Sequence, residues 1–240
     1  MMKRLIFNGY QAEDLGFIVV EGAPETLANE NYEVVEIEGR SGSLIINKGT
    51  YPDIERTFTI TAIDYIEDEN IEEMMNNIKK WFFNVTDNRL YYAFSNKYHI
   101  VKKVIFDEDV RTSFEQFGDF QVTFLCEPFY YEDEPTLTYM PGNTYRYVND
   151  GDFESYPKIV FHGMGTMEII VNGESTKVNN VQSLLQLDSQ LLVCVDGDLH
   201  NRNKDLIGDY PVFKIGENII QVPSGQGITQ IVITPRTTFR

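Results

Sequence analysis

The sequence has few of the residues from which metal sites and disulfide frameworks are built. Its 240 residues include two cysteines, Cys126 and Cys194, and three histidines, His99, His162 and His200. The cysteines stand in separate apolar stretches, and no histidine lies at ligand spacing from a cysteine or another histidine. We therefore expect two buried thiols, folding in a reducing compartment, and neither a zinc-type metal site nor a bound cofactor.

Basic residues are scarce relative to acidic ones. Lys and Arg number 20 and Asp and Glu 37, which gives a formal net charge of −17 at pH 7. Such a chain repels phosphate backbones, so specific nucleic-acid binding is not expected. Charged residues make up 24% of the sequence and are spread along it, which is typical of a folded protein and not of a disordered acidic tail.

Long apolar runs are absent. No stretch approaches the roughly 20 apolar residues that a membrane-spanning helix needs. The apolar run after Lys3 and Arg4 is too short for a signal peptide. Hydrophobic residues nevertheless make up 42% of the chain, enough for the core of one large or two modest domains. We expect a soluble protein with no membrane partner and no N-terminal export signal.

Motifs for catalysis are also lacking. There is no G-x-S-x-G, and no serine or cysteine stands out as an activated nucleophile. The glycine-rich run 39–43 lacks the lysine of a phosphate-binding loop and is followed by no helical pattern, so we interpret it as a tight turn. Pairs of carboxylates would suit a glycosidase, but 37 acidic side chains will form some pairs by chance. The sequence therefore predicts no enzyme and no catalytic residue.

The loop 196–209 is rich in Asp and Asn and resembles a calcium loop superficially. Asn201, Asn203 and Asp205 alternate as ligands would, but Leu206 stands where such a loop needs glycine, and its twelfth position is Val212. A solvated surface loop is the better interpretation.

The chain is organised around the stretch from Gly118 to Pro135. Its first part alternates apolar and polar residues, which predicts a half-buried strand ended by Pro128; the side chains expected on the buried face are Phe120, Val122, Phe124 and Cys126. The acidic run 132–134 and Pro135 cannot pack against a core. We therefore place a connector there, between domains at 1–131 and 136–240. The alternative is an ordinary loop inside one large domain.

The first domain mixes strands with one expected helix. Apolar residues recur at helical spacing from Asn70 to Phe83, and Asn70 with Glu73 forms a candidate capping box. Strands are expected before and after this helix; their ranges are 3–8, 17–21, 32–38, 56–66, 89–94 and 98–106. This order predicts an α+β domain.

The second domain shows only strand patterns. Turn signals recur at short intervals, and Asn172-Gly173 between apolar runs is the strongest hairpin signal. This spacing predicts an antiparallel β-sandwich, with strands at 144–148, 158–162, 167–172, 183–187, 191–195, 212–215, 218–222 and 228–234. Many sandwiches bind sugars, often by stacking an aromatic ring on them. The second domain has no Trp, and the aromatic candidates are Tyr130, Tyr131, Tyr139, Tyr145, Tyr147, Tyr156 and Tyr210.

The order of several short motifs resembles the distal tail protein family of long-tailed (siphovirus) bacteriophages. Each motif is weak alone, but together they span nearly the whole chain. They are Phe7-Asn8-Gly9 and Leu15-Gly16; Gly39 to Leu44, Gly49-x-Tyr51 and a long alternating strand; a helix ending in Trp81, then Leu90-Tyr91 and Tyr98; Glu127-Pro128-Phe129; and Asn149-Asp150-Gly151, Tyr156-Pro157, Gly163-x-Gly165, Asn172-Gly173, Tyr210-Pro211 and Gly216-Glu217-Asn218.

The resemblance implies a ring-forming α+β domain followed by a galectin-like β-sandwich, in the compact form without an inserted carbohydrate-binding module. It implies a structural virion protein at the tail tip, made in the bacterial cytoplasm, and no enzymatic activity. The implied partners are further copies in a hexameric hub or stacked rings, the major tail tube protein, the tail-associated lysin or tip protein and a receptor-binding protein. DNA would pass through the channel without specific binding. The alternative is a β-sandwich protein that recognises a bacterial cell-wall polymer.

Two further expectations concern assembly. The alternating strand from residue 56 is a candidate contact surface, because an unpaired strand edge invites pairing; the candidate interface residues are Arg56, Phe58, Ile60 and Ala62. With −17 charges on each copy, a ring would have apolar or charge-matched interfaces and an acidic or neutral channel.

Overall fold

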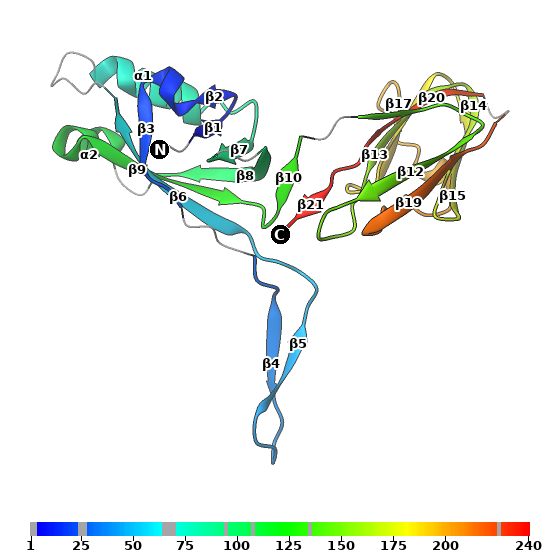
Figure 1. Ribbon diagram of the computed structural model, residues 1–240, viewed down its shortest axis with the longest axis horizontal. Helices are drawn as coiled ribbons and strands as arrows, with labels where there is room; N and C mark the ends of the chain where they lie inside the picture. The colour runs from blue at the N-terminus through cyan, green and yellow to red at the C-terminus, as the bar shows by residue number, and fades with distance from the viewer. Residues whose placement is uncertain are drawn as a thin grey trace. The chain divides into compact units, whose positions relative to one another are not determined.

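A computed structural model describes residues 4–23, 28–63, 71–93, 96–106, 109–133, 136–224 and 227–240. The chain divides into two compact units, one comprising Met1–Tyr131 with Arg240 and the other Glu132–Phe239 (Figure 1). The connector expected at 132–135 lies partly outside the described residues. Neither described α-helix has the length and apolar character needed to span a bilayer.

The described chain is mostly β. The first unit holds two short α-helices, α1 (Ile71–Phe82) and α2 (Val110–Phe117), beside a long antiparallel sheet, so the structure supports a mostly β chain and not the stronger expectation of an α+β domain. Its strands are β1 (Leu5–Phe7), β2 (Tyr10–Gln11), β3 (Phe17–Glu21), β4 (Tyr32–Glu36), β5 (Ser43–Asn47), β6 (Ile54–Ala62), β7 (Arg89–Tyr92), β8 (Lys97–Ile105), β9 (Asp119–Cys126) and β10 (Tyr130–Glu132), and a 3₁₀ turn spans Ala12–Leu15.

The sheet of the first unit runs in the order β2-β1-β7-β8-β9-β6-β3. The strands β6 and β9 pair antiparallel along most of their length, with Phe58 opposite Val122 and Ile60 opposite Phe120. Every second residue of each strand faces the core, as the alternation in the sequence predicts. This long pair forms the middle of the sheet and carries much of the aromatic core.

Helix α1 confirms the helix expected at 70–83. Its buried side chains are Met74, Ile78, Trp81 and Phe82, while acidic residues lie in its first turn and lysines in its last. Asn70, the expected capping residue, lies outside the described residues. One stripe of the helix is therefore buried against the sheet, as the amphipathic spacing predicts.

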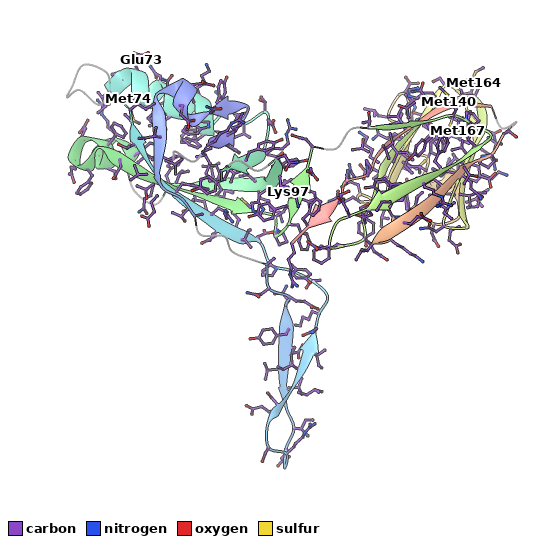
Figure 2. The ribbon with its side chains drawn as sticks, viewed as in Figure 1. Glu73, Met74, Lys97, Met140, Met164 and Met167 are labelled. Carbon is purple, nitrogen blue, oxygen red and sulfur yellow. The ribbon has the colours of Figure 1, made fainter. Side chains whose placement is uncertain are left out.

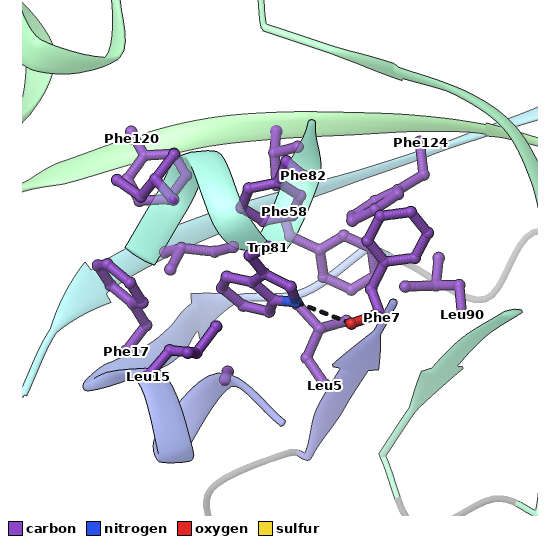
Figure 3. Packing of buried hydrophobic residues seen from close by; sticks show 14 of the residues in the cluster. Leu5, Phe7, Leu15, Phe17, Phe58, Trp81, Phe82, Leu90, Phe120 and Phe124 are labelled. Atoms are coloured by element: carbon purple, nitrogen blue, oxygen red, sulfur yellow. Dashed lines mark hydrogen bonds between the residues drawn. The ribbon is translucent and has the colours of Figure 1, made fainter. Parts of the chain in front are cut away.

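Aromatic rings fill the core between α1 and the sheet (Figure 3). Trp81 donates a hydrogen bond from Nε1 to the backbone oxygen of Phe7 at 3.1 Å, and its ring stacks on Phe17 at 5.9 Å. Beside it, Asn8 donates to the backbone oxygen of Trp81 and accepts from the backbone nitrogen of Thr86 at 2.8 Å. These bonds satisfy buried polar groups at the helix end. They fix the helix to the turn after β1.

Helix α2 is not among the elements that the sequence predicts. The side chain of Asp109 accepts from the backbone nitrogens of Arg111 and Thr112, and Gly118 ends the helix with a φ of +75°. An Asp cap and a terminal glycine are the usual start and stop signals of a helix. At eight residues the helix is too short for its apolar spacing to stand out, although Phe114 is buried.

The second unit consists of two five-stranded antiparallel sheets around one core. The sheet orders are β11-β20-β13-β16-β17 and β12-β19-β14-β15-β18. The strands of these sheets are β11 (Leu137–Tyr139), β12 (Asn143–Asn149), β13 (Lys158–Gly163), β14 (Gly165–Val171), β15 (Glu174–Val181), β16 (Leu184–Asp188), β17 (Val193–Asp196), β18 (Leu206–Ile207), β19 (Gly216–Val222) and β20 (Ile228–Thr234), with a 3₁₀ turn at Asn203–Asp205. A further short strand, β21 (Thr238–Phe239), belongs to neither sheet.

Most strand expectations for this unit are confirmed. Asn172 and Gly173 have φ values of +53° and +92° and join β14 to β15, as the hairpin signal predicts. The strand expected at 212–215 is wrong: only Phe213 pairs, in an isolated bridge with Ser155. Cys126 in the first unit and Cys194 in the second are both free and buried, as expected.

Candidate assembly surface

The most unusual surface of the first unit is the hairpin made by β4 and β5, which we call the arm (residues 32–47). Among the strands that the structure describes, these two pair only with each other, with Val34 opposite Ile45 and Val35 opposite Leu44. In Figure 1 no other element of the first unit lies against either face of the arm. The arm is therefore a two-stranded sheet with two free faces.

Both faces of the arm carry apolar side chains (Figure 2). One face holds Val34 and Ile45, and the other holds Val35, Leu44 and Ile46. The exposed large apolar residues of the arm have between 43% and 61% of their surface in contact with solvent; they are Tyr32, Val34, Ile37, Leu44, Ile45 and Ile46. Contiguous exposed apolar surface of this kind marks interaction sites.

Local sequence explains why the arm is a hairpin. β-branched residues fill both strands, and Gly39 and Gly42 supply φ values of +79° and +84° at the turn between them. At the base, Asn31 donates its backbone N–H to Thr50 and accepts from Lys48 at 2.8 Å. These bonds define the arm's geometry, but a two-stranded hairpin alone is marginally stable in water. A surface that covered the arm would therefore stabilise it.

The strand that the sequence suggests as a contact surface is β6, which is not part of the arm. β6 sits between β9 and β3, so it does not offer the open edge that its alternation suggested. Its side chains on the core face are buried; they include the candidate interface residues Arg56, Phe58, Ile60 and Ala62. The alternation reflects one buried face of an interior strand. The sequence predicts the first strand of the arm, at 32–38, and the tight turn at 39–43, but neither β5 nor the pairing of the two strands in a hairpin.

Several titratable groups lie buried near β6. Arg56 is 4% exposed and donates to the hydroxyl of Tyr130 at 3.3 Å. Burial, together with the nearby Arg56 charge, lowers the pKa of His99 to about 4, and its Nδ1 lies 2.9 Å from the backbone oxygen of Phe129. Burial raises the pKa of Cys126 to about 12. A neutral imidazole and a protonated thiol in the core are structural groups.

One group of possible metal ligands occurs in the second unit. Asp196, Asp198 and His200 bring ligand atoms within 4.8 Å of one another on an exposed turn. The Oδ1 atom of Asp196 already accepts from the backbone nitrogens of Asp198 and His200. These bonds make the turn itself, so the group is explained by local structure.

The tyrosines considered for sugar stacking are largely engaged in packing. Tyr139 and Tyr145 stack on each other at 4.0 Å, and the hydroxyl of Tyr147 hydrogen-bonds Thr237 at 2.7 Å. Tyr210 donates to Asn203. Tyr156 is exposed but stands without a polar cluster around it among the described residues.

Comparison with known proteins shows a relationship of fold. No family model matches the chain, and no curated protein matches it in sequence. The crystal structure of phage SPP1 Dit, described as a paradigm of the hub adsorption apparatus in phages that infect Gram-positive bacteria, superposes with a TM-score of 0.68 and 14% identity, covering 98% of this chain and 99% of that one. A phage p2 baseplate structure in its activated conformation gives 0.49 and 8% over 98% of both chains, a likeness too low to argue from. The chain therefore has the fold of SPP1 Dit along nearly its whole length.

Proposed function

We propose that the chain is a structural distal tail protein of a phage or prophage. It forms a hexameric hub that joins the tail tube to the tail-tip or baseplate proteins. The observation that carries this proposal is the likeness to SPP1 Dit, a hub protein, which extends over both units of this chain and leaves no part of either chain uncovered beyond a few residues. A likeness confined to one unit would support only a shared module.

The uncovered arm supports the same role. A monomeric protein rarely exposes a contiguous apolar hairpin, whereas an assembly subunit buries such a surface against its neighbours. We assign ring formation to the first unit, which carries the arm. The buried residues of β6, including Arg56 and Phe58, contribute by holding the sheet in shape and not by direct contact.

The second unit serves as a scaffold in this proposal. Its two sheets lie around one core, an arrangement that supports the proposal of a galectin-like sandwich. The engagement of its tyrosines in internal packing argues against strong sugar binding. Its proposed contacts are the tail tube protein, the tail-associated lysin or tip protein and a receptor-binding protein. No enzymatic activity is proposed, because the buried titratable groups are held in unreactive forms.

Electrostatics constrain the ring. Each copy carries a formal charge of −17, so six copies repel one another unless their contacts are apolar or charge-matched. A channel lined by acidic or neutral side chains lets DNA pass, since a basic lining would bind it through counterion release. We therefore propose an acidic or neutral channel and an assembly that salt promotes by screening.

The proposal is tested on particles. An epitope tag on the chain, followed by gold labelling and electron microscopy of virions, should place label at the tail tip, and inactivation of the gene should yield particles without functional tails. Label elsewhere, or normal tails without the gene, would contradict the role. Binding of the purified chain to cell-wall polymer, without any ring in negative stain, would favour the cell-wall recognition protein instead.

A further inference from the structure

In the first unit, the second half of β8 has one unpaired strand edge. On one side, residues from Val101 to Ile105 pair with β9. On the other side, β7 begins at Arg89, which lies opposite Ile100. The residue before β7, Asn88, accepts a hydrogen bond from the backbone nitrogen of Val101. β10 also pairs with β8, and its Tyr130 and Tyr131 lie against His99 and Tyr98, near the start of that strand. Within the described ranges, the pairing of β8 with β7 does not extend to the second edge from Lys102 onward. An unpaired edge of this kind accepts a further strand.

An apolar groove lies along this open edge. It has a volume of about 190 Å³ and is lined by the end of α1 and the following segment, with Phe82, Phe83 and Val85, and by β8 with the residue after it, from Val101 to Val104 and Phe106. The rings of Phe83 and Phe106 stack at 5.7 Å, and Phe83 is 66% exposed. The volume is below the roughly 300 to 1,000 Å³ of pockets for small molecules. Its size suits side chains of a docking strand.

Charge gives the groove a preference. Lys102 is engaged with Asp53 at 2.7 Å. Lys103, beside it, is exposed and forms no ion pair with any described residue. The groove therefore favours an apolar strand that brings a carboxylate.

The arm has the complementary features. Val34 and Ile45 form one exposed apolar face, and Glu36 continues that face at the end of β4. Glu36 forms no ion pair within the described part of the chain. The outer edge of β4 is unpaired as well.

We propose that the arm of a second copy of this chain docks on the open edge of β8. Its β4 strand extends the sheet, Val34 and Ile45 enter the groove, and Glu36 pairs with Lys103. This inference rests on the proposed function for its six-fold closure, and it names the contact through which that ring forms. The arm and the edge of β8 are different surfaces, so their contact is a head-to-tail interface, which is the type that closes into rings.

Cysteine cross-linking of the full chain tests the contact. Cys126 and Cys194 are buried, with pKa values raised to about 12 and about 11 by burial, so engineered surface thiols will react selectively. Val34→Cys with Phe83→Cys should give a ladder of covalent oligomers on mild oxidation. The matched control is Val34→Cys with Val148→Cys, because Val148 is 60% exposed on a strand of the second unit. Circular dichroism confirms that each variant folds.

A charge swap tests the ion pair. Lys103→Glu and Glu36→Lys should each weaken self-association by about tenfold in sedimentation experiments at low salt, and the double swap should restore it. No restoration, or a ladder equal to that of the control pair, overturns the contact. So does a chain that stays monomeric at every concentration without cross-links. Six-fold rings that form without the Val34–Phe83 ladder would overturn this contact and leave the hub role standing. A ladder without label at the tail tip would support the contact and contradict the hub role.

Discussion

The indole nitrogen of Trp81 and the backbone oxygen of Phe7 are joined by a buried hydrogen bond of 3.1 Å. This bond ties the last turn of α1 to β1, at the centre of the aromatic core (Figure 3). It accounts for the presence of the chain's single Trp at this position, because a buried indole needs an acceptor for its N–H.

Replacement of Trp81 by Phe should therefore destabilise the first unit. The variant loses the bond, leaves the Phe7 oxygen without its donor and opens a small cavity, at a combined cost of about 3 kcal/mol. Urea unfolding monitored by circular dichroism measures the change. Phe117→Leu is the control, since Phe117 is 72% exposed and should shift stability by less than about 0.5 kcal/mol. Equal midpoints for Trp81→Phe and wild type would contradict the assignment.

Buried His99 should make the first unit sensitive to mild acid. Its pKa is lowered to about 4, chiefly by burial and then by the charge of Arg56, whereas an unfolded histidine titrates near 6.5. Between these values the unfolded state binds more protons, so stability is complete above about pH 6.5 and falls as the pH drops toward 4, by at most about 3 kcal/mol.

The pH dependence is measured by unfolding the protein in urea at intervals from pH 7 to pH 4. In His99→Gln the slope over this window should flatten. Phe117→Leu is the control, because it changes an exposed side chain, removes no titratable group and should leave the slope unchanged. A slope that persists in His99→Gln would assign the acid sensitivity to other groups.

The Asp188–Arg236 pair should stabilise the second unit. Arg236 binds both carboxylate oxygens of Asp188, at 2.7 and 2.8 Å, and Asp188 is buried. Burial alone raises the pKa of Asp188, but the hydrogen bonds from Arg236 and the backbone of Leu191 outweigh it, so the pKa lies below its usual value.

Arg236→Met should cost roughly 3 kcal/mol at neutral pH, because it leaves a buried carboxylate without its partner. Wild type should keep this contribution above about pH 4 and lose it as the pH falls through the lowered pKa; the variant lacks the contribution at neutral pH, so the stability difference between the two proteins should shrink as the pH falls. The control is Arg146→Met, whose partner Glu217 is exposed and whose loss should cost less than about 1 kcal/mol. Similar effects of the two changes would argue against the buried pair.

Charges placed on the arm should block assembly without unfolding the protein. Val34→Asp and Ile45→Asp alter side chains that make no contact with the core of the first unit, so the melting temperature should stay within a few degrees. Self-association by light scattering should fall by at least about tenfold, because a buried unpaired carboxylate opposes docking. Val148→Asp, equally exposed but in the second unit, should leave association unchanged.

The two units should fold separately. The compact units divide after Tyr131, and the sequence there is acidic and contains proline. A protease that cleaves after Glu should cut between Glu132 and Thr136, and fragments 1–131 and 136–240 should each show a cooperative unfolding transition. Two unfolded fragments and no cut in that region would mean that the units depend on each other.

Regular elements could be predicted from the sequence where local pattern and tertiary packing agree. β9 and α1 each bury one periodic face, and Asn172-Gly173 marks its hairpin through backbone conformation alone. Helix α2 was missed because eight residues give little periodic signal, although Asp109 and Gly118 mark its ends.

The assembly surface was harder to predict, since it depends on neighbours in space. Alternation in β6 looks the same for an edge strand and for an interior strand, and only the positions of β3 and β9 show that it is interior. The arm has apolar residues on both faces, so it lacks the polar side by which a surface strand is usually recognised. The open edge at Lys102 becomes visible only when the end of β7 is known.

The two-faced character of the arm bears on the time between synthesis and incorporation into a particle. A strand pair with one buried face has its register fixed, because a slip of one residue would turn polar groups inward. The arm has no such constraint, and in a newly made subunit it can attach to any exposed strand it meets. The −17 charge of each subunit slows those encounters by mutual repulsion and keeps the subunits dispersed. In the proposed hub, the acidity of the chain would thus delay contact between subunits until each one meets its place in the growing tail.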